Sequence, residues 1–208
     1  MRETNTDLPE NLLRWVAAQG QGNLSRLERH VARREAWVVD IARGDGSTLE
    51  GFLRIDRNPR EGSNVSLRRE ASICNALRPL DIPVPALLAW NEEYHAALFS
   101  REVGRADIHA LDDQQQQRSV MENFIDIIAQ LHQLEIAELG LDEVLGGPPD
   151  TPARCALDDV DHQLKQFSRF LAHYNDPLIS YGVQWLRRYV PTQVSRVSLV
   201  QGDTGPVN

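Results

Sequence analysis

Leu199-Val200-Gln201-Gly202-Asp203-Thr204-Gly205-Pro206-Val207-Asn208 is the stretch of sequence on which the fold prediction depends. The apolar, β-branched run at 197–200 leads into a turn rich in Gly and Pro, a pattern that predicts a strand ending in a tight loop. This loop presents one carboxylate, Asp203, and one carboxamide, Asn208, with four residues between them. An acid in such a loop can take a proton from a hydroxyl group while the amide binds a metal ion.

The interval from Asp203 to Asn208 equals that of the protein-kinase catalytic loop, H-R-D-x-x-x-x-N. In that loop the Asp is the catalytic base and the Asn is a magnesium ligand. Gly, Pro and Asp are also common turn residues, so the loop alone is equally compatible with an ordinary turn. The rest of the chain has to discriminate between the two interpretations.

Length and composition indicate a globular protein with room for one large domain or two small ones. The chain has 208 residues, of which 41% are hydrophobic and 25% are charged. No apolar run approaches the roughly 18 residues of a membrane span, and no hydrophobic signal segment follows Met1, so we expect a cytoplasmic protein. A formal net charge of -8 without a basic stripe disfavours binding to nucleic acid or to an anionic membrane.

The N-terminal half predicts a sheet with two helices. We expect helices over 9–16 and 63–77, strands over 36–41, 49–55 and 96–103, and a segment over 80–90 that leaves the second helix through two prolines and runs into a strand. The Asp45-Gly46 dipeptide is a hairpin signal between the first two strands. Cys74 falls in the apolar stripe of the second helix, where we expect a buried free thiol.

Glycines precede this sheet, in the segment Gly20-Gln21-Gly22-Asn23. Two glycines in such a position allow a main-chain loop to close over phosphates. A helix end followed by a turn explains them equally well, so both interpretations stay open.

Alternation along the strand 49–55 places Arg54 on one face with Glu50 and Phe52. Kinases carry the Lys that holds nucleotide phosphates on an equivalent strand, where it pairs with a Glu on a helix. The alternative is a solvated Arg at the edge of a sheet.

A carboxylate falls on the apolar face of the helix 63–77, because Glu70 follows Leu67 by three residues. An unpaired charge on a buried face costs several kcal/mol, so Glu70 requires a cation. Arg54 is the partner that we favour, with Arg68, Arg69 or solvent as alternatives.

The second half of the chain is predicted to be helical. Apolar residues recur at steps of three and four, which indicates helices over 114–136, 157–174 and 177–190. His132, beside the apolar stripe of the first of these, is expected to be a packed histidine rather than a catalytic one.

Together these features resemble the aminoglycoside phosphotransferase family, kinase-like enzymes that phosphorylate small molecules, over about residues 20–208. The resemblance rests on five features: the glycine segment, Arg54, Glu70, the prolines of Ile82-Pro83-Val84-Pro85, and the loop from Gly202-Asp203 to Asn208. Ala129-Gln130-Leu131-His132 is similar to an A-x-L-H segment of the family. The strand Arg is reminiscent of the subgroup associated with acyl-CoA dehydrogenases.

The resemblance implies a kinase-like α+β fold in two lobes. The N-terminal lobe, 1–103, would contain an N-terminal helix, an antiparallel sheet and the helix of Glu70. A partial, mostly helical C-terminal lobe, 104–208, would end in the catalytic loop. The implied activity is transfer of the γ-phosphoryl group of ATP, with Mg²⁺, to a hydroxyl of a small molecule, which we expect to be a metabolite rather than an antibiotic.

The resemblance also implies the roles of individual residues. Asp203 would orient and deprotonate the hydroxyl, and Asn208 would bind magnesium. Arg54, held by Glu70, would bind the phosphates. The implied cofactor-binding set is completed by the phosphate loop at Gly22 and Asn23 and by the adenine-contacting main chain from Arg101 to Val103.

Two departures from the family pattern affect the expected activity. Gln201 stands where the family usually has His, so we expect weakened loop geometry. A further metal-binding acid that follows the Asn in the family is not reached before the chain ends, and we expect the 208-residue chain by itself not to catalyse transfer. The alternatives are a non-catalytic kinase-like module that binds a nucleotide or a partner, and an unrelated α+β domain. Whether the natural chain continues past Asn208 is left open.

Overall fold

The computed structural model describes residues 8–30, 35–59, 66–104, 107–147, 151, 154, 164–165, 172–173, 176–189 and 196–202. The chain divides into two compact units. One consists of Met1–Ile127 and Gly202–Asn208, and the other of Ile128–Gln201. The predicted lobe boundary between 103 and 104 stays a prediction.

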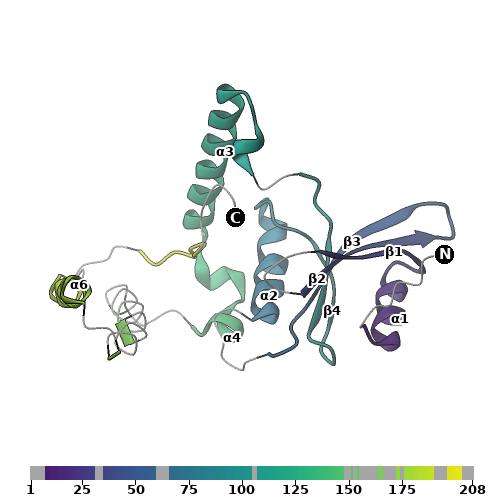
Figure 1. Ribbon diagram of the computed structural model, residues 1–208, viewed down its shortest axis with the longest axis horizontal. Coiled ribbons are helices and arrows are strands. Elements are labelled where there is room, and N and C mark those ends of the chain that lie inside the picture. The colour runs from purple at the N-terminus through teal and green to yellow at the C-terminus, as the bar shows by residue number, and fades with distance from the viewer. Residues whose placement is uncertain are drawn as a thin grey trace. The chain divides into compact units, whose positions relative to one another are not determined.

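The first unit contains one antiparallel sheet of five strands in the order β1-β2-β3-β5-β4 (Figure 1). Its strands are β1 (Gly22–His30), β2 (Glu35–Arg43), β3 (Thr48–Ile55), β4 (Leu87–Asn91) and β5 (Ala96–Ser100). Every neighbouring pair is antiparallel. The predicted α+β fold with an antiparallel sheet is therefore confirmed.

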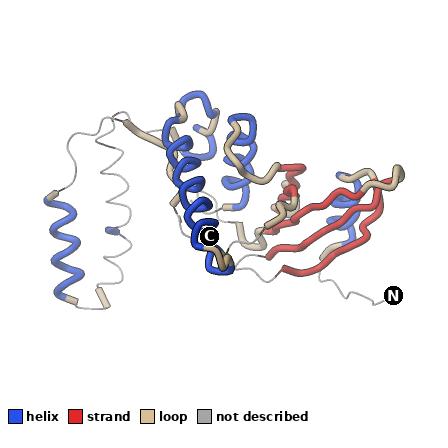
Figure 2. The backbone as a smooth tube through the Cα atoms, turned by 90° about the horizontal axis from the view of Figure 1, so that it is seen from above, coloured by secondary structure: helices blue, strands red, loops and turns tan. Residues whose placement is uncertain are grey.

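One face of the sheet is apolar and packs against α1 (Glu10–Gln19), which lies beside the sheet in Figure 2. Leu12 and Val16 of this helix are fully buried. They meet the alternate buried residues of β2 and β3, among them Val39, Ile41 and Leu53. Because strand side chains alternate, the residues between these point to the opposite face.

The opposite face receives α2 (Leu67–Leu77), which begins at the N-cap Ser66. The Ser66 hydroxyl accepts a hydrogen bond from the amide of Arg69 at 3.2 Å, a favourable cap. Leu67 and Ala71 pack on Phe99 and on Ala97 of β5. The sheet is thus covered by a different helix on each face. On the α2 face, no apolar cluster of the described residues covers β1, β2 and β3.

The sequence did not predict β1, although it predicted the other four strands. No residue of β1 is buried, and the second half of its sequence GNLSRLERH carries three charged residues. An edge strand with no buried residue lacks the alternation of apolar and polar residues by which strands are recognised in a sequence. The strand predicted over 96–103 ends at Ser100.

Helices follow the sheet. They are α3 (Gln114–Gln133), α4 (Asp142–Leu145) and α6 (Pro177–Arg188), with short 3₁₀ helices at Arg78–Leu80, Ile108–Ala110 and Ile136–Leu139. Asp176 caps α6 by accepting from the amide of Leu178 at 2.8 Å. The predicted helix 157–174 lies largely outside the described residues. Residues 197–200, predicted as a strand, form none.

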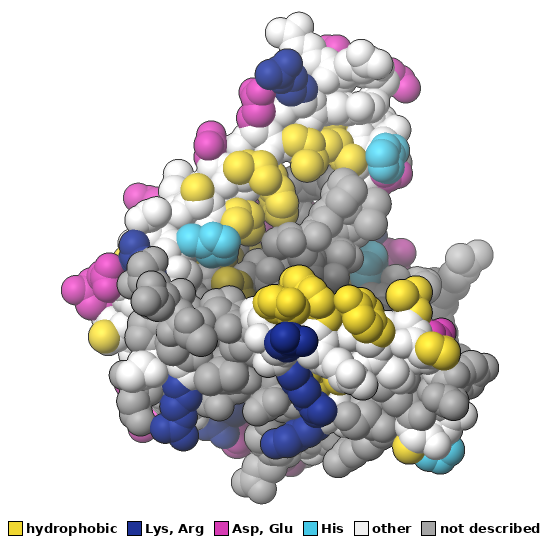
Figure 3. All heavy atoms as spheres, turned by 90° about the vertical axis from the view of Figure 1, so that its left-hand side faces the viewer, with side chains coloured by type: hydrophobic (Ala, Val, Ile, Leu, Met, Phe, Trp, Pro, Cys, Tyr) yellow, Lys and Arg dark blue, Asp and Glu magenta, His cyan; other side chains and the backbone are white. Residues whose placement is uncertain are grey.

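Apolar side chains remain exposed on α3 and on α6, and Figure 3 shows exposed apolar side chains in yellow on the surface of the molecule. On α6 they include Leu178 and Tyr181, and Tyr189 directly follows the helix; each is more than half exposed. Among the described residues, no helix is long and apolar enough to cross a membrane.

Gly22 is required by close packing between β1 and β2, and replacing it tests this packing. A Cβ atom on Gly22 would lie 2.1 Å from the main-chain oxygen of Ala42. We expect Gly22→Ala to lower the free energy of unfolding by about 2 kcal/mol, because main-chain atoms have to shift. Urea denaturation measures the loss. Gly44→Ala is the control, since nothing lies within 4 Å of its Cβ position; equal losses for the two variants would contradict the packing argument.

Candidate functional site

An ion pair between β3 and α2 lies at the centre of the site. Arg54 Nη1 donates to Glu70 Oε1, so the pair that the sequence favoured is formed. The side chain of Arg54 is 21% exposed and that of Glu70 is 37% exposed, which leaves the guanidinium partly open to solvent. Arg54 lies between Ala36 of β2 and Ala97 of β5, and these small neighbours leave room beside its side chain.

Cys74, one turn after Glu70 on α2, is the free thiol expected from the sequence, although it is half-buried rather than fully buried. Burial raises the pKa of this thiol, and the charge of Glu70 raises it further. Arg54 acts on the same pKa in the opposite direction. The thiol therefore stays protonated at neutral pH and provides no nucleophile here.

An apolar row crosses the sheet next to Arg54. Val38 of β2, Phe52 of β3 and Phe99 of β5 stand opposite one another in register. The ring of Phe52 makes an edge-on contact with the ring of His30, at the end of β1, with centroids 5.3 Å apart. Phe99 is covered by α2, whereas Val38 and Phe52 are only half-buried, so the open part of this row is an apolar surface two residues along β3 from a cation.

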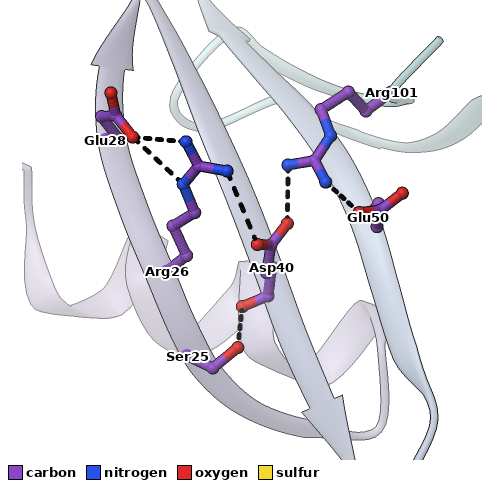
Figure 4. A network of polar contacts seen from close by, with 6 residues as sticks. All are labelled: Ser25, Arg26, Glu28, Asp40, Glu50 and Arg101. Carbon is purple, nitrogen blue, oxygen red and sulfur yellow. Dashed lines mark hydrogen bonds and ion pairs between the residues drawn. The ribbon is translucent and has the colours of Figure 1, made fainter. Parts of the chain in front are cut away.

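A row of alternating charges follows the apolar row, as Figure 4 shows. Arg26 of β1 contacts Glu28 at 2.5 Å and Asp40 of β2 at 3.9 Å. Arg101, which follows β5, contacts Asp40 at 2.7 Å and also pairs with Glu50 of β3. Hydrogen bonding and charge from Glu28 raise the pKa of Arg26, and the same contact with Arg26 lowers the pKa of Glu28.

The main chain after β5 runs along this charged row, and we call residues 101–103 the linker. The amide of Arg101 donates to the carbonyl of Glu50 at 3.2 Å. Val103 is 94% exposed. Within the described residues, no hydrogen bond engages the amide of Val103 or the carbonyl of Arg101. The linker therefore offers one donor and one acceptor to a ligand.

The structure does not bring the glycine segment to Arg54. Gly20 caps the end of α1, and Gly22 and Asn23 begin β1 opposite the end of β2. Arg54 pairs with Ala36 at the start of β2, about 23 Å away along the strand. Residues 31–34, which follow β1 in the sequence, lie outside the described residues.

Asp203 and Asn208, the predicted base and metal ligand, also lie outside the described residues. The segment that leads to them is fixed to the end of α3. Arg196 donates to the carbonyl of Gln133 at 2.5 Å and to Glu135 at 2.9 Å, and the Ser198 hydroxyl donates to the carbonyl of His132 at 3.1 Å. Among the described residues, no group of three acidic, His or Cys side chains could hold a metal ion.

Comparison with known proteins gives one family. The model described as "Phosphotransferase enzyme family" matches residues 37–208, which include most of β2, Arg54, Glu70, the linker and the loop from Asp203 to Asn208. No curated protein matches the chain. The match covers well over half of the 208 residues and includes the predicted catalytic residues, but it does not include the predicted phosphate loop at Gly22 and Asn23. The chain therefore belongs to the phosphotransferase enzyme family.

Proposed function

We propose that the protein transfers the γ-phosphoryl group of ATP to a hydroxyl of a small molecule. The observation that carries this proposal is the Arg54–Glu70 pair, which lies on the same sheet face as the apolar row and the linker. Membership of a phosphotransferase family gives the reaction class. The cation, the apolar row and the linker on the sheet face match the phosphates, the base and the base edge of a nucleotide.

The spacing of these features fits ATP. Arg54, Phe52 and Glu50 follow one another at two-residue steps along β3, so each step is roughly 6.6 Å. A base against the apolar row would direct its phosphates toward the guanidinium of Arg54, a strong donor to phosphate oxygens. The other edge of the base would face the linker, where a free amide and a free carbonyl match an acceptor and an amino group on adenine.

Asp203 and Asn208 supply the chemical groups in this proposal. The Asp203 carboxylate accepts the proton of the acceptor hydroxyl, whose oxygen forms a bond to the γ-phosphorus. The bond from that phosphorus to the leaving oxygen breaks, and the products are a phosphate ester and ADP. Amide and carboxylate oxygens are the ligands that Mg²⁺ prefers, so Asn208 fits as its ligand. Bound there, the ion neutralises charge on the phosphates.

Positioning accounts for most of the rate in reactions of this class, because the transition state is loose. Glu70 holds Arg54 in place, and Arg196 and Ser198 fix the segment that enters the catalytic loop. A metabolite alcohol is the proposed acceptor, on the strength of the Phe52-Leu53-Arg54 resemblance to the subgroup associated with acyl-CoA dehydrogenases.

A second candidate function is nucleotide binding without chemistry. Gln201 favours it, because this residue replaces the His that usually precedes Gly-Asp in the catalytic loop. Gln can still donate and accept hydrogen bonds, so the substitution alters the loop without removing its polar contacts.

A transfer assay on the protein from its natural source separates the two candidates. The protein is incubated with Mg²⁺, γ-labelled ATP and a panel of alcohols that includes hydroxyacyl compounds and aminoglycosides. We expect the label to appear in one class of alcohol, with hydroxyacyl compounds ahead of aminoglycosides. Binding of Mg-ATP without any transfer would support the binding module instead, and failure to bind Mg-ATP would contradict both.

A further inference from the structure

The side chain of Arg101 connects three parts of the first unit that are distant in sequence. It pairs with Asp40 of β2 and Glu50 of β3, 61 and 51 residues earlier in the chain. Its own main chain begins the linker, and its amide donates to the Glu50 carbonyl. Arg101 thus contacts β3 through both its side chain and its main chain (Figure 4).

The contact with Asp40 is the best shielded in the charged row. The side chains of Arg101 and Asp40 are 20% and 18% exposed, whereas that of Glu28 is 62% exposed. A pair that is mostly removed from water is screened less by salt than an exposed one. The guanidinium is also a rigid fork, which can bind two carboxylates at once in a way that a Lys ammonium does not reproduce.

We propose that Arg101 is a positioning residue for the nucleobase, because its side chain fixes the linker against the hairpin of β2 and β3. This inference rests on the proposed function, since it assigns the linker to base recognition. The donor and acceptor of the linker are set at a fixed distance from Phe52 by the bridge to Asp40 and Glu50. Arg26, which also contacts Asp40, extends the same bridge to β1.

The bridge acts on the base and not on the phosphates. Glu50 is four residues along β3 from Arg54, roughly 13 Å, and Phe52 lies between them. The row from Glu28 to Glu50 contains three carboxylates and two guanidiniums, so it adds no net positive charge for phosphates. Loss of the bridge should therefore weaken the binding of adenosine and the binding of Mg-ATP by the same factor.

The test uses two kinds of variant. Arg101→Lys keeps the charge and removes the fork, while Asp40→Asn and Glu50→Gln keep Arg101 and remove one carboxylate charge each. Arg78→Lys is the matched control, because Arg78 makes a single bond to the carbonyl of Val84, at 2.7 Å, outside the charged row. Calorimetry measures the Kd for adenosine and for Mg-ATP with each folded variant.

We expect Arg101→Lys to raise both Kd values about fivefold, with no change for Arg78→Lys. Hydrogen exchange without ligand supplies a second readout: the Arg101 amide should exchange faster in Asp40→Asn and in Glu50→Gln than in the wild type. A weaker Mg-ATP affinity with unchanged adenosine affinity would overturn the proposal, and so would unchanged values for both ligands. If the wild type binds neither ligand, the proposed function fails and the role of Arg101 fails with it.

Discussion

Replacing Asp203 with asparagine is expected to lower the turnover of phosphoryl transfer about a thousandfold. General-base catalysis contributes about this factor, and an amide cannot accept the hydroxyl proton. The variant keeps the size of the side chain and its hydrogen-bonding capacity, so the loss of turnover measures the contribution of proton transfer to the reaction. The Kd for Mg-ATP should change little, because Arg54 and the linker are proposed to supply most of the nucleotide contacts.

The measurement is a steady-state assay of the natural protein with the acceptor that the alcohol panel identifies. Asp45→Asn is the matched control, because the Asp45 carboxylate only accepts hydrogen bonds from Ser47 in the turn between β2 and β3. Turnover of Asp203→Asn within threefold of the wild type would show that another group is the base. A parallel fall in Mg-ATP affinity would assign Asp203 to binding instead.

Replacing Arg54 with methionine is expected to raise the Kd for Mg-ATP about thirtyfold. A charge-assisted hydrogen bond to phosphate contributes about 2 kcal/mol, which corresponds to this factor. Methionine retains an unbranched apolar stem, so packing against Ala36 and Ala97 is largely kept. The Kd for adenosine should stay the same, because adenosine has no phosphates.

Arg57→Met is the control for this second prediction. Arg57 lies three residues beyond Arg54, and its side chain donates to Glu35 at 2.6 Å. This variant should bind Mg-ATP as the wild type does. Equal losses for Arg54→Met and Arg57→Met would mean that general positive charge, and not the Arg54 site, attracts the nucleotide. An unchanged Kd in Arg54→Met would remove Arg54 from the site.

The Arg54–Glu70 contact could be predicted from sequence because two local periodicities determine it. Alternation placed Arg54 on one face of β3, and helical spacing placed Glu70 on the apolar face of α2. The cost of an unpaired buried charge then made each the partner of the other. The helix end at Gly20 was one of two interpretations of the glycine segment, and the phosphate loop at Gly22 and Asn23 stays a prediction.

The bridge from Arg101 to Asp40 could not be predicted in the same way. It depends on β5 lying beside β3, and the helix α2 separates these strands in the sequence. The Asp45-Gly46 hairpin signal does imply that β2 pairs with β3, which brings Asp40 near Glu50, so two of the three partners were accessible. The third partner, Arg101, could be placed only once the order of the strands in the sheet was known. Asp203 and Asn208 lie outside the described residues, so their roles stay predictions.

Photo-crosslinking with azido-ATP, followed by peptide mapping, tests most directly whether the sheet face between Arg54 and the linker is the nucleotide site. The account predicts labelled peptides that contain Phe52 or residues 101–103, with labelling suppressed by excess Mg-ATP. Labelling confined to peptides from β4 or from α6, or labelling that excess Mg-ATP leaves unchanged, would contradict it.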